Sequence, residues 1–252
     1  MYFLFSGEGP TDLGSGRSGL EIHEHLAGHF EPGPLAHLVD QIVADAKGFS
    51  PLETLHCGFV SESSLIERKG QLNPAKKSVV LRGVKRPKET IYFYNNARVL
   101  ARIARKKWLS LDDAAAKVVA ILFRDADGTA SASRGNWADK HQSMINGFAA
   151  EGWASGVPMM PNPKSEAWFL CALQDNPYQN CHSLELASGN DRSPNALKPR
   201  LEQWLGPPVT AERLGELVKD RTIDAAKIDM PSFQAFRDRL HGAIDHQVDS
   251  PQ

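Results

Sequence analysis

The chain has 252 residues, of which 41% are hydrophobic and 23% are charged, and it carries 29 lysines and arginines against 30 aspartates and glutamates. This composition is typical of a globular protein, and a chain of this length buries enough surface to fold without a disulfide or a structural metal. No apolar run approaches the length of a membrane span, so we do not expect an integral membrane protein.

The three cysteines predict the compartment. Cys57, Cys171 and Cys181 form no CxxC pair, and an odd number leaves at least one of them unpaired. Free thiols in a reducing environment are the usual state of such cysteines. We therefore expect free thiols and a cytoplasmic location.

Hydrophobic patterns and turn residues predict strands that alternate with helices. A strand at 2–6 is followed by a loop at 7–34 that is rich in Gly, Ser and Pro, and the apolar spacing at 35–46 is that of an amphipathic helix. The later expected elements are, in chain order, a strand at 54–60, a hairpin around 78–94 in which 91–94 is extended, a helix capped by Asn95 or Asn96 that runs to about Trp108, a short helix at 111–117, a strand at 118–123, a helix at 136–150, a strand at 156–160, a helix at 165–173, and short helices near 196–205, 211–219 and 232–246.

The run VVAILF at 118–123 indicates the fold class. It is continuously apolar and ends at Arg-Asp-Ala-Asp-Gly, which is the pattern of a central strand buried on both faces and occurs mainly in parallel sheets. Together with the alternating elements, it predicts an α/β fold with a mostly parallel sheet, flanking helices and a small helical extension at the C-terminus. We expect an α/β domain at 1–175, with a basic insertion at about 66–95, and the extension at 176–252.

Positive charge is concentrated in one stretch. Thirteen of the basic residues lie between Arg68 and Lys107, where only Glu89 opposes them. Such a stretch in a near-neutral chain favours a polyanion as partner, although a charged surface balanced by carboxylates elsewhere would give the same pattern. We expect nucleic acid, either DNA or RNA, to contact basic residues of this stretch and one near the acidic loops: Lys76, Lys77, Arg82, Lys85, Arg86, Lys88, Arg98, Arg102, Arg105 and Lys164.

Acidic side chains follow three of the predicted strands. Glu8 and Asp12 follow the first strand, Asp125 and Asp127 follow VVAILF, and Glu166 follows the strand at 156–160. Ligands of open parallel sheets bind beyond the carboxyl ends of the strands. Asp125 and Asp127 leave an extended chain on the same face, where they repel each other unless a cation lies between them. Mg²⁺ or Mn²⁺, which prefer oxygen ligands, are the expected cations.

Four segments resemble a known family. EGPTD at 8–12, PGPLAHLVDQI at 32–42, FRDADG at 123–128 and NPKSEAWFL at 162–170 are together similar to a small bacterial TOPRIM-like family. It is related to the TOPRIM domain of topoisomerases, primases and OLD-type nucleases, and some of its relatives lie among phage-defence genes. The resemblance covers about residues 1–175.

The resemblance implies a Mg²⁺-dependent nuclease that cleaves nucleic-acid phosphodiesters, with a role in anti-phage defence and an ATPase or sensor protein as partner. It makes Glu8 the general acid/base and a metal ligand, and Asp125 and Asp127 the metal-binding pair. A third aspartate found in some TOPRIM proteins is replaced by Thr129, so Glu166 or Asp12 would have to supply the missing ligand.

Two other functions fit part of the pattern. The segment ILFRDADGT at 121–129 also matches the nucleophile loop of haloacid-dehalogenase-like phosphatases, in which Asp125 would be the nucleophile and Asp127 the acid/base. That reading gives Glu8 no role and finds no GDxxxD motif later in the chain. A non-catalytic nucleic-acid-binding or regulatory module is the third alternative.

Four histidines lie close together in the chain. His23, His25, His29 and His37 include one i, i+4 pair, His25 and His29, which would suit Zn²⁺ or Mn²⁺, although solvated histidines are the simpler interpretation. Trp168, in the predicted helix at 165–173, is expected in the core together with its neighbour Phe169.

Overall fold

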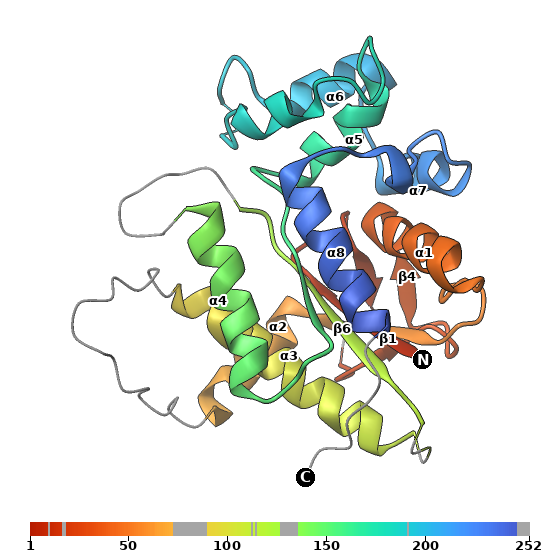
Figure 1. The fold of residues 1–252 in the computed structure, drawn as a ribbon, viewed down its shortest axis with the longest axis vertical. Coiled ribbons are helices and arrows are strands. Elements are labelled where there is room, and N and C mark those ends of the chain that lie inside the picture. Colours follow the sequence, from red (N-terminus) through yellow and green to blue (C-terminus); the bar gives the residue numbers. More distant parts are fainter. Residues whose placement is uncertain are drawn as a thin grey trace, which may run out of the picture.

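The computed structural model describes residues 1–9, 11–16, 19–72, 90–111, 113, 115–126, 136–190 and 192–245. A five-stranded sheet runs through the centre of these residues in the order β3-β5-β1-β6-β7 (Figure 1). Its strands are β1 (Tyr2–Gly7), β3 (His23–Glu24), β5 (Cys57–Ser61), β6 (Val118–Phe123) and β7 (Gly156–Met159). All neighbouring pairs are parallel except β3 with β5. The predicted α/β class with a mostly parallel sheet is confirmed.

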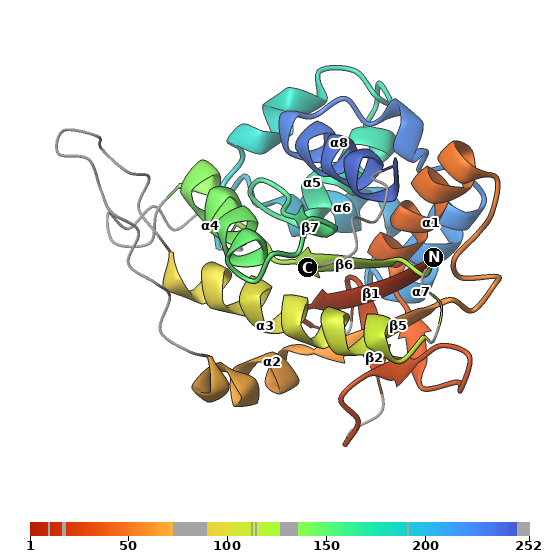
Figure 2. The ribbon, with the colours of Figure 1, turned by 60° about the horizontal axis from the view of Figure 1, so that its bottom comes forward.

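Side chains alternate between the two faces of the sheet, and each face has its own hydrophobic cluster. Phe3 and Phe5 point to the cluster formed with α1 (Pro34–Lys47), α5 (Ser165–Leu173) and α8 (Pro231–Asp245). Leu4, between them, belongs to the cluster formed with α2 (Glu62–Arg68), α3 (Ile91–Leu109) and α4 (Trp137–Ala150). Figure 2 shows the sheet between the helices of the two faces.

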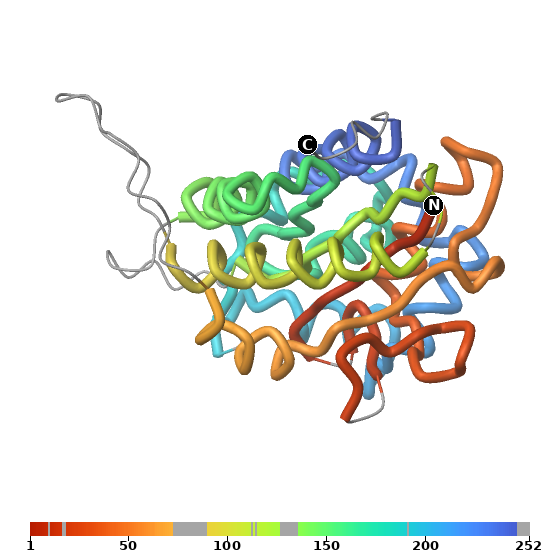
Figure 3. Tube along the Cα trace, turned by 90° about the horizontal axis from the view of Figure 1, so that it is seen from below, coloured from red at the N-terminus to blue at the C-terminus, as the bar shows by residue number. Residues whose placement is uncertain are grey.

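Helices α3 and α4 lie side by side (Figure 3). A Cβ atom at Gly147 would lie 2.3 Å from the carbonyl oxygen of Tyr94, so glycine is required for this approach. Asn136 begins α4, because its side chain accepts a hydrogen bond from the N–H of Asp139. The helix expected at 136–150 is therefore confirmed together with its cap.

The C-terminal region contributes to the same core as the sheet. It contains η2 (Cys181–Leu186), α6 (Leu197–Leu205), α7 (Ala211–Lys219), η3 (Ala225–Lys227) and α8. Phe233 and Phe236 of α8 pack against Trp168 of α5, with ring centroids 4.9 and 5.8 Å away. Trp168 and Phe169 are buried, as expected. The boundary near residue 175 stays a prediction, and residues on both sides of it share one hydrophobic cluster.

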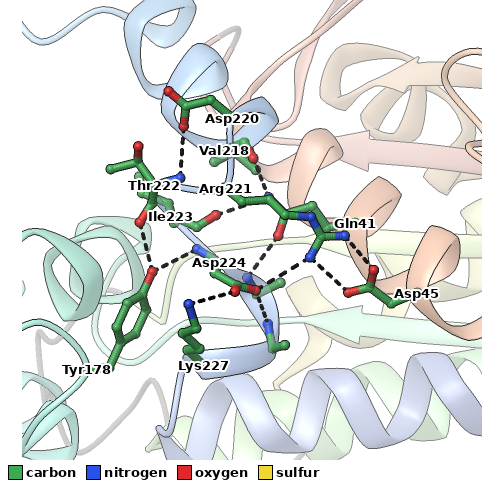
Figure 4. A network of polar contacts seen from close by, with 12 residues as sticks. Gln41, Asp45, Tyr178, Val218, Asp220, Arg221, Thr222, Ile223, Asp224 and Lys227 are labelled. Atoms are coloured by element: carbon green, nitrogen blue, oxygen red, sulfur yellow. Dashed lines mark hydrogen bonds and ion pairs between the residues drawn. The ribbon is translucent and has the colours of Figure 1, made fainter.

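A polar network fastens the segment between α7 and η3 to helix α1 (Figure 4). The buried Gln41 side chain donates to the carbonyl oxygens of Val218 and Ile223, the latter at 3.1 Å, and accepts from the N–H of Ala225 at 2.9 Å. Because these backbone groups are satisfied, the segment is held without a buried polar penalty. The other labelled members of the network are Asp45, Tyr178, Asp220, Arg221, Thr222, Asp224 and Lys227.

Several expected elements are wrong in type. Residues 91–94 form the first turn of α3 and are not extended, and Asn96 lies inside that helix rather than at its start. The rest of the expected hairpin, 78–89, lies outside the described residues. The described residues of the expected helix at 111–117 are not helical. There the Asp113 carboxylate accepts from the N–H of Ala115, a local bond that competes with helix formation.

Other expected elements differ in extent. The loop expected at 7–34 contains three short strands: β2 (Gly14–Gly16), β3 and β4 (Phe30–Pro32), of which β2 and β4 pair antiparallel. The strand expected at 54–60 begins only at Cys57. None of the helices within the described residues is long and apolar enough to cross a membrane.

Cys171 and Cys181 form a disulfide, with Cα atoms 5.1 Å apart, and Cys57 is a buried free thiol. The expectation that all three cysteines are free thiols is therefore wrong. Cys171 lies near the end of α5, and the chain returns to place Cys181 at the start of η2 beside it. The two cysteines are ten positions apart, so no CxxC motif indicates their pairing in the sequence.

Candidate functional site

The carboxyl ends of β1, β6 and β7 meet at one edge of the sheet because these strands are parallel. Glu8 follows β1, and Asp125 follows β6 after one intervening residue. The backbone N–H of Asp125 donates to Glu8 Oε1 at 2.5 Å, across a separation of 117 positions in the chain. The structure thus brings the acidic segments after the first and the central strand into direct contact.

Helix α5 begins at this edge, and its first residue contacts two of the acids. The N–H of Ser165 donates to Asp125 Oδ1 at 3.0 Å, and its hydroxyl donates to Asp12 Oδ1 at 2.7 Å. The residue at the N-cap position is Lys164, whose side chain caps nothing, so the Asp125 carboxylate accepts the N–H in place of a cap. The partial positive charge of the helix N-terminus favours carboxylates here.

Four carboxyl groups influence one another at this edge. Burial raises the pKa of Asp125 well above its usual value, and the charges of Asp12, Glu166 and Glu8 raise it further, against the N–H of Ser165. Carboxyl groups held this close repel one another when ionised, and a cation among them relieves the repulsion. We call Glu8, Asp12, Asp125 and Glu166 the acidic rim.

Asp12 is held by a different balance of forces. Burial raises the pKa of its carboxyl, while the hydroxyl of Ser165 and the charge of Lys164 favour the ionised form. Lys164 is therefore close enough to the acidic rim for its charge to act on Asp12.

The donors of the acidic rim fit a hard divalent cation in their chemistry, because they are carboxylate oxygens. Asp127, the second expected ligand after β6, lies outside the described residues. Within the described ranges, no group of three or more His, Cys, Asp or Glu side chains is placed so that it could hold a metal ion. The assignment of Glu8, Asp12, Asp125, Asp127 and Glu166 to a metal therefore stays a prediction.

Three of the expected nucleic-acid contacts form interactions within the chain. Arg98 and Arg102 on α3 pair with the two carboxylate oxygens of Glu151, at 2.7 and 2.9 Å, and Arg105 donates to the Glu151 carbonyl at 2.6 Å. Arg98 is only 6% exposed. These arginines share one helix face, which packs against the end of α4. Their assignment to nucleic acid stays a prediction.

The other expected basic contacts are not described. Lys76, Lys77, Arg82, Lys85, Arg86 and Lys88 lie outside the described residues. At the two ends of the basic stretch, Arg68 pairs with Glu21 at 2.9 Å and Lys107 with Glu24 at 2.8 Å. These two residues fit the alternative interpretation, in which carboxylates elsewhere in the chain balance the positive charge.

The histidine segment is arranged around aromatic rings. His25 Nδ1 lies 3.0 Å from the carbonyl oxygen of Phe30, and burial lowers the pKa of His23. His25 and His37 both line a cavity of about 680 Å³ between the 15–33 segment, α1 and α7. No third ligand joins the His25 and His29 pair among the residues that the structure describes.

Sequence reasoning missed Ser165, which contacts both Asp12 and Asp125. A serine at the first position of a helix is common, so its type alone gave no signal. The lysine at the N-cap position was an available signal, because α5 then needs an acceptor from elsewhere for its first N–H groups.

Comparison of the chain with protein-family models, with curated proteins and with solved structures finds no match. The interpretation of the acidic rim therefore depends on its residues and their geometry.

Proposed function

We propose that the acidic rim is the metal site of a TOPRIM-like nuclease, dependent on Mg²⁺ or Mn²⁺, that cleaves nucleic-acid phosphodiesters. The observation that carries the proposal is the contact between Glu8 and the backbone of Asp125. The two motifs whose sequences resemble TOPRIM segments are far apart in the chain, and a shared catalytic site requires that they meet.

In this proposal, a bound metal supplies charge neutralisation at the phosphate and polarises the attacking or leaving oxygen. Asp125 and Asp127 hold the metal, with Asp12 and Glu166 as further oxygen donors. Glu8 moves a proton between the attacking or leaving oxygen and solvent. Ser165 orients two of the carboxylates, as second-shell partners commonly do in metal sites.

The phosphatase alternative uses the same aspartates differently. Asp125 as a nucleophile needs its carboxylate open to a phosphate, whereas here the carboxylate accepts a bond from Ser165 and lies among three other acids. Glu8 would have no part in that chemistry. These observations favour the nuclease, and the phosphatase remains an outcome of the test below.

The biological setting is part of the proposal. We infer anti-phage defence, in the cytoplasm, with DNA or RNA as substrate and an ATPase or sensor protein as activator. The Cys171–Cys181 disulfide removes the argument for the cytoplasm from free thiols, because disulfides persist mainly in oxidising compartments. The remaining support for a cytoplasmic location is that nucleic acid, the proposed substrate, is found there.

Cleavage assays distinguish the three readings. We expect the full chain to cleave at least one of single-stranded DNA, duplex DNA and RNA with Mg²⁺ or Mn²⁺, and not with EDTA, and to leave p-nitrophenyl phosphate intact. Glu8→Gln, which keeps the size and the oxygen acceptor, should abolish cleavage. Hydrolysis of p-nitrophenyl phosphate that persists in Glu8→Gln would support the phosphatase, and binding without turnover would support a regulatory module.

Ser165→Ala should weaken metal binding by roughly tenfold, because Asp12 loses the hydroxyl that orients its carboxylate while Asp125 keeps its backbone N–H bond. Titration with Mn²⁺ in a calorimeter measures the affinity. Ser165→Thr retains a hydroxyl and should recover most of it, and Ser183→Ala removes an exposed hydroxyl elsewhere as a control. Equal Mn²⁺ affinity in all four proteins would contradict the role of Ser165.

A further inference from the structure

Beside the acidic rim, two cations share one aromatic ring. Tyr92, in the first turn of α3, has Lys69 Nζ 4.6 Å and Arg124 Cζ 5.9 Å from its ring centroid. Its hydroxyl accepts from Arg124 Nε at 3.2 Å and donates to Glu62. Lys69 and Arg124 therefore cluster around Tyr92 near the carboxyl ends of β5 and β6. We call these two residues the cation pair.

The hydrogen-bonding capacity of the cation pair is not filled. Arg124 is fully buried and uses Nε on Tyr92 and Nη1 on the Phe123 carbonyl, yet its Nη2 has no partner within the described residues. The Lys69 ammonium donates no hydrogen bond and forms no ion pair to any residue that the structure describes, and its one contact of this kind is with the Tyr92 ring. Buried donors are nearly always paired in folded proteins, so the unpaired Nη2 of Arg124 points to an absent acceptor. The neighbouring Lys69 is partly exposed, so its ammonium is accessible to a ligand from solvent.

The charges around the cation pair are consistent with an anion as that acceptor. Burial and the neighbouring charge of Arg124 lower the pKa of Lys69, which shows that the two cations repel each other. Glu62 is the carboxylate that reaches the cluster, and its hydrogen bond goes to the Tyr92 hydroxyl. A phosphate oxygen near Lys69 would relieve the repulsion and accept its protons.

The position of the cation pair relates it to the acidic rim. Arg124 directly precedes Asp125, and successive residues of an extended chain point to opposite faces of the sheet. The charge of Glu8 contributes to the raised pKa of Tyr92, so Tyr92 lies within electrostatic range of the acidic rim. Carboxylates and cations thus stand on either side of the chain that leaves β6.

We propose that Lys69 and Arg124 form a binding site for a phosphate of the nucleic-acid backbone, next to the acidic rim. The site rests on the proposed function, since it holds the substrate whose phosphodiester the acidic rim would cleave. Lys69, which is partly exposed, contacts the phosphate, and the buried Arg124, whose Nη2 has no partner among the described residues, is the second cation of the site. Contacts of this kind give affinity without sequence preference.

Binding of fluorescein-labelled DNA and RNA oligonucleotides to the full chain, measured by anisotropy in EDTA over a series of KCl concentrations, tests the site. Lys69→Met should weaken binding about tenfold at low salt and reduce the salt slope by about one. Lys69→Arg should bind as the wild type does. Lys106→Met is the matched control, because Lys106 lies at the far end of α3, is exposed and pairs with Glu21, and it should change binding less than about twofold.

The outcomes separate this site from the nuclease proposal. Binding in EDTA involves neither metal nor cleavage, so loss of cleavage in Glu8→Gln with normal oligonucleotide binding bears on the acidic rim alone. Equal affinity and salt slope in Lys69→Met and the wild type would overturn the phosphate site, as would absence of oligonucleotide binding by the wild type. Inorganic pyrophosphate can be added as a competitor in the same assay. If Lys69→Met binds the oligonucleotide normally but is no longer inhibited by pyrophosphate, the site binds free phosphate groups and the proposal is overturned.

Discussion

Asp125→Asn should reduce metal-dependent cleavage on the order of 1,000-fold while leaving the fold intact. Asparagine keeps an oxygen that can accept the Ser165 N–H, and the backbone N–H that donates to Glu8 is unchanged. The substitution removes only the negative charge that the metal requires. Initial rates with Mg²⁺ and with Mn²⁺, compared at saturating nucleic acid, measure the loss.

The same variant has a second readout that does not depend on activity. Because the pKa of Asp125 is raised in the folded protein, the stability that this carboxyl contributes is present below its unfolded pKa and is lost as pH rises through its folded pKa. Without metal at neutral pH, Asp125→Asn should therefore have a thermal midpoint equal to or above that of the wild type. Toward about pH 4 the difference should shrink, because the wild-type carboxyl is then protonated.

Metal should reverse the order of stabilities. A cation that binds the folded state raises the wild-type midpoint, and the effect should grow from acid to neutral pH as protons cease to compete. The midpoint of Asp125→Asn should respond little to Mg²⁺ or Mn²⁺. Equal stabilisation of both proteins by Mg²⁺, or retained cleavage by the variant, would exclude Asp125 as a ligand.

The parts of the fold that the sequence predicts well are those that local patterns determine. The VVAILF run and the alternating pattern around it are sufficient to place β6 and its neighbours, and helices α5 and α7 begin and end at the residues expected from the sequence. The contact between Glu8 and Asp125 could be expected because both residues follow parallel strands, whose carboxyl ends lie at the same edge of the sheet. None of these inferences needs the packing of any particular side chain.

The inferences that fail depend on tertiary contacts. Residues 91–94 have the composition of a strand, but the N–H of Thr90 bonds Ser143 of α4 and Tyr92 bonds Arg124, and these contacts hold the chain as the first turn of α3. The spacing of Arg98, Arg102 and Arg105 gives their common face but not its partner, Glu151. The disulfide likewise depends on how the chain returns to α5.

Trp168→Ala should lower the free energy of unfolding by about 4 kcal/mol, because it empties the contact between the sheet-bound helix α5 and the C-terminal helix α8. Trp168 is fully buried, packs on Phe233 and Phe236, and donates its indole N–H to Ser232 Oγ at 2.9 Å. Urea titrations followed by circular dichroism measure the change. Trp168→Phe, which keeps an aromatic ring but loses the hydrogen bond, should cost about 1–2 kcal/mol.

The Trp168 variants also test whether residues 1–175 and 176–245 are one cooperative unit. Since both parts share a hydrophobic cluster, the wild type should unfold in a single transition, and Trp168→Ala should shift the whole transition. Trp204→Ala is the control, because Trp204 on α6 is 45% exposed and its loss should change stability by less than about 0.5 kcal/mol. If Trp168→Ala instead split the transition in two, with the sheet unfolding at its original midpoint, the C-terminal helices would be a separate domain that merely packs on the sheet. In that case the acidic rim would be positioned by α5 without help from α8.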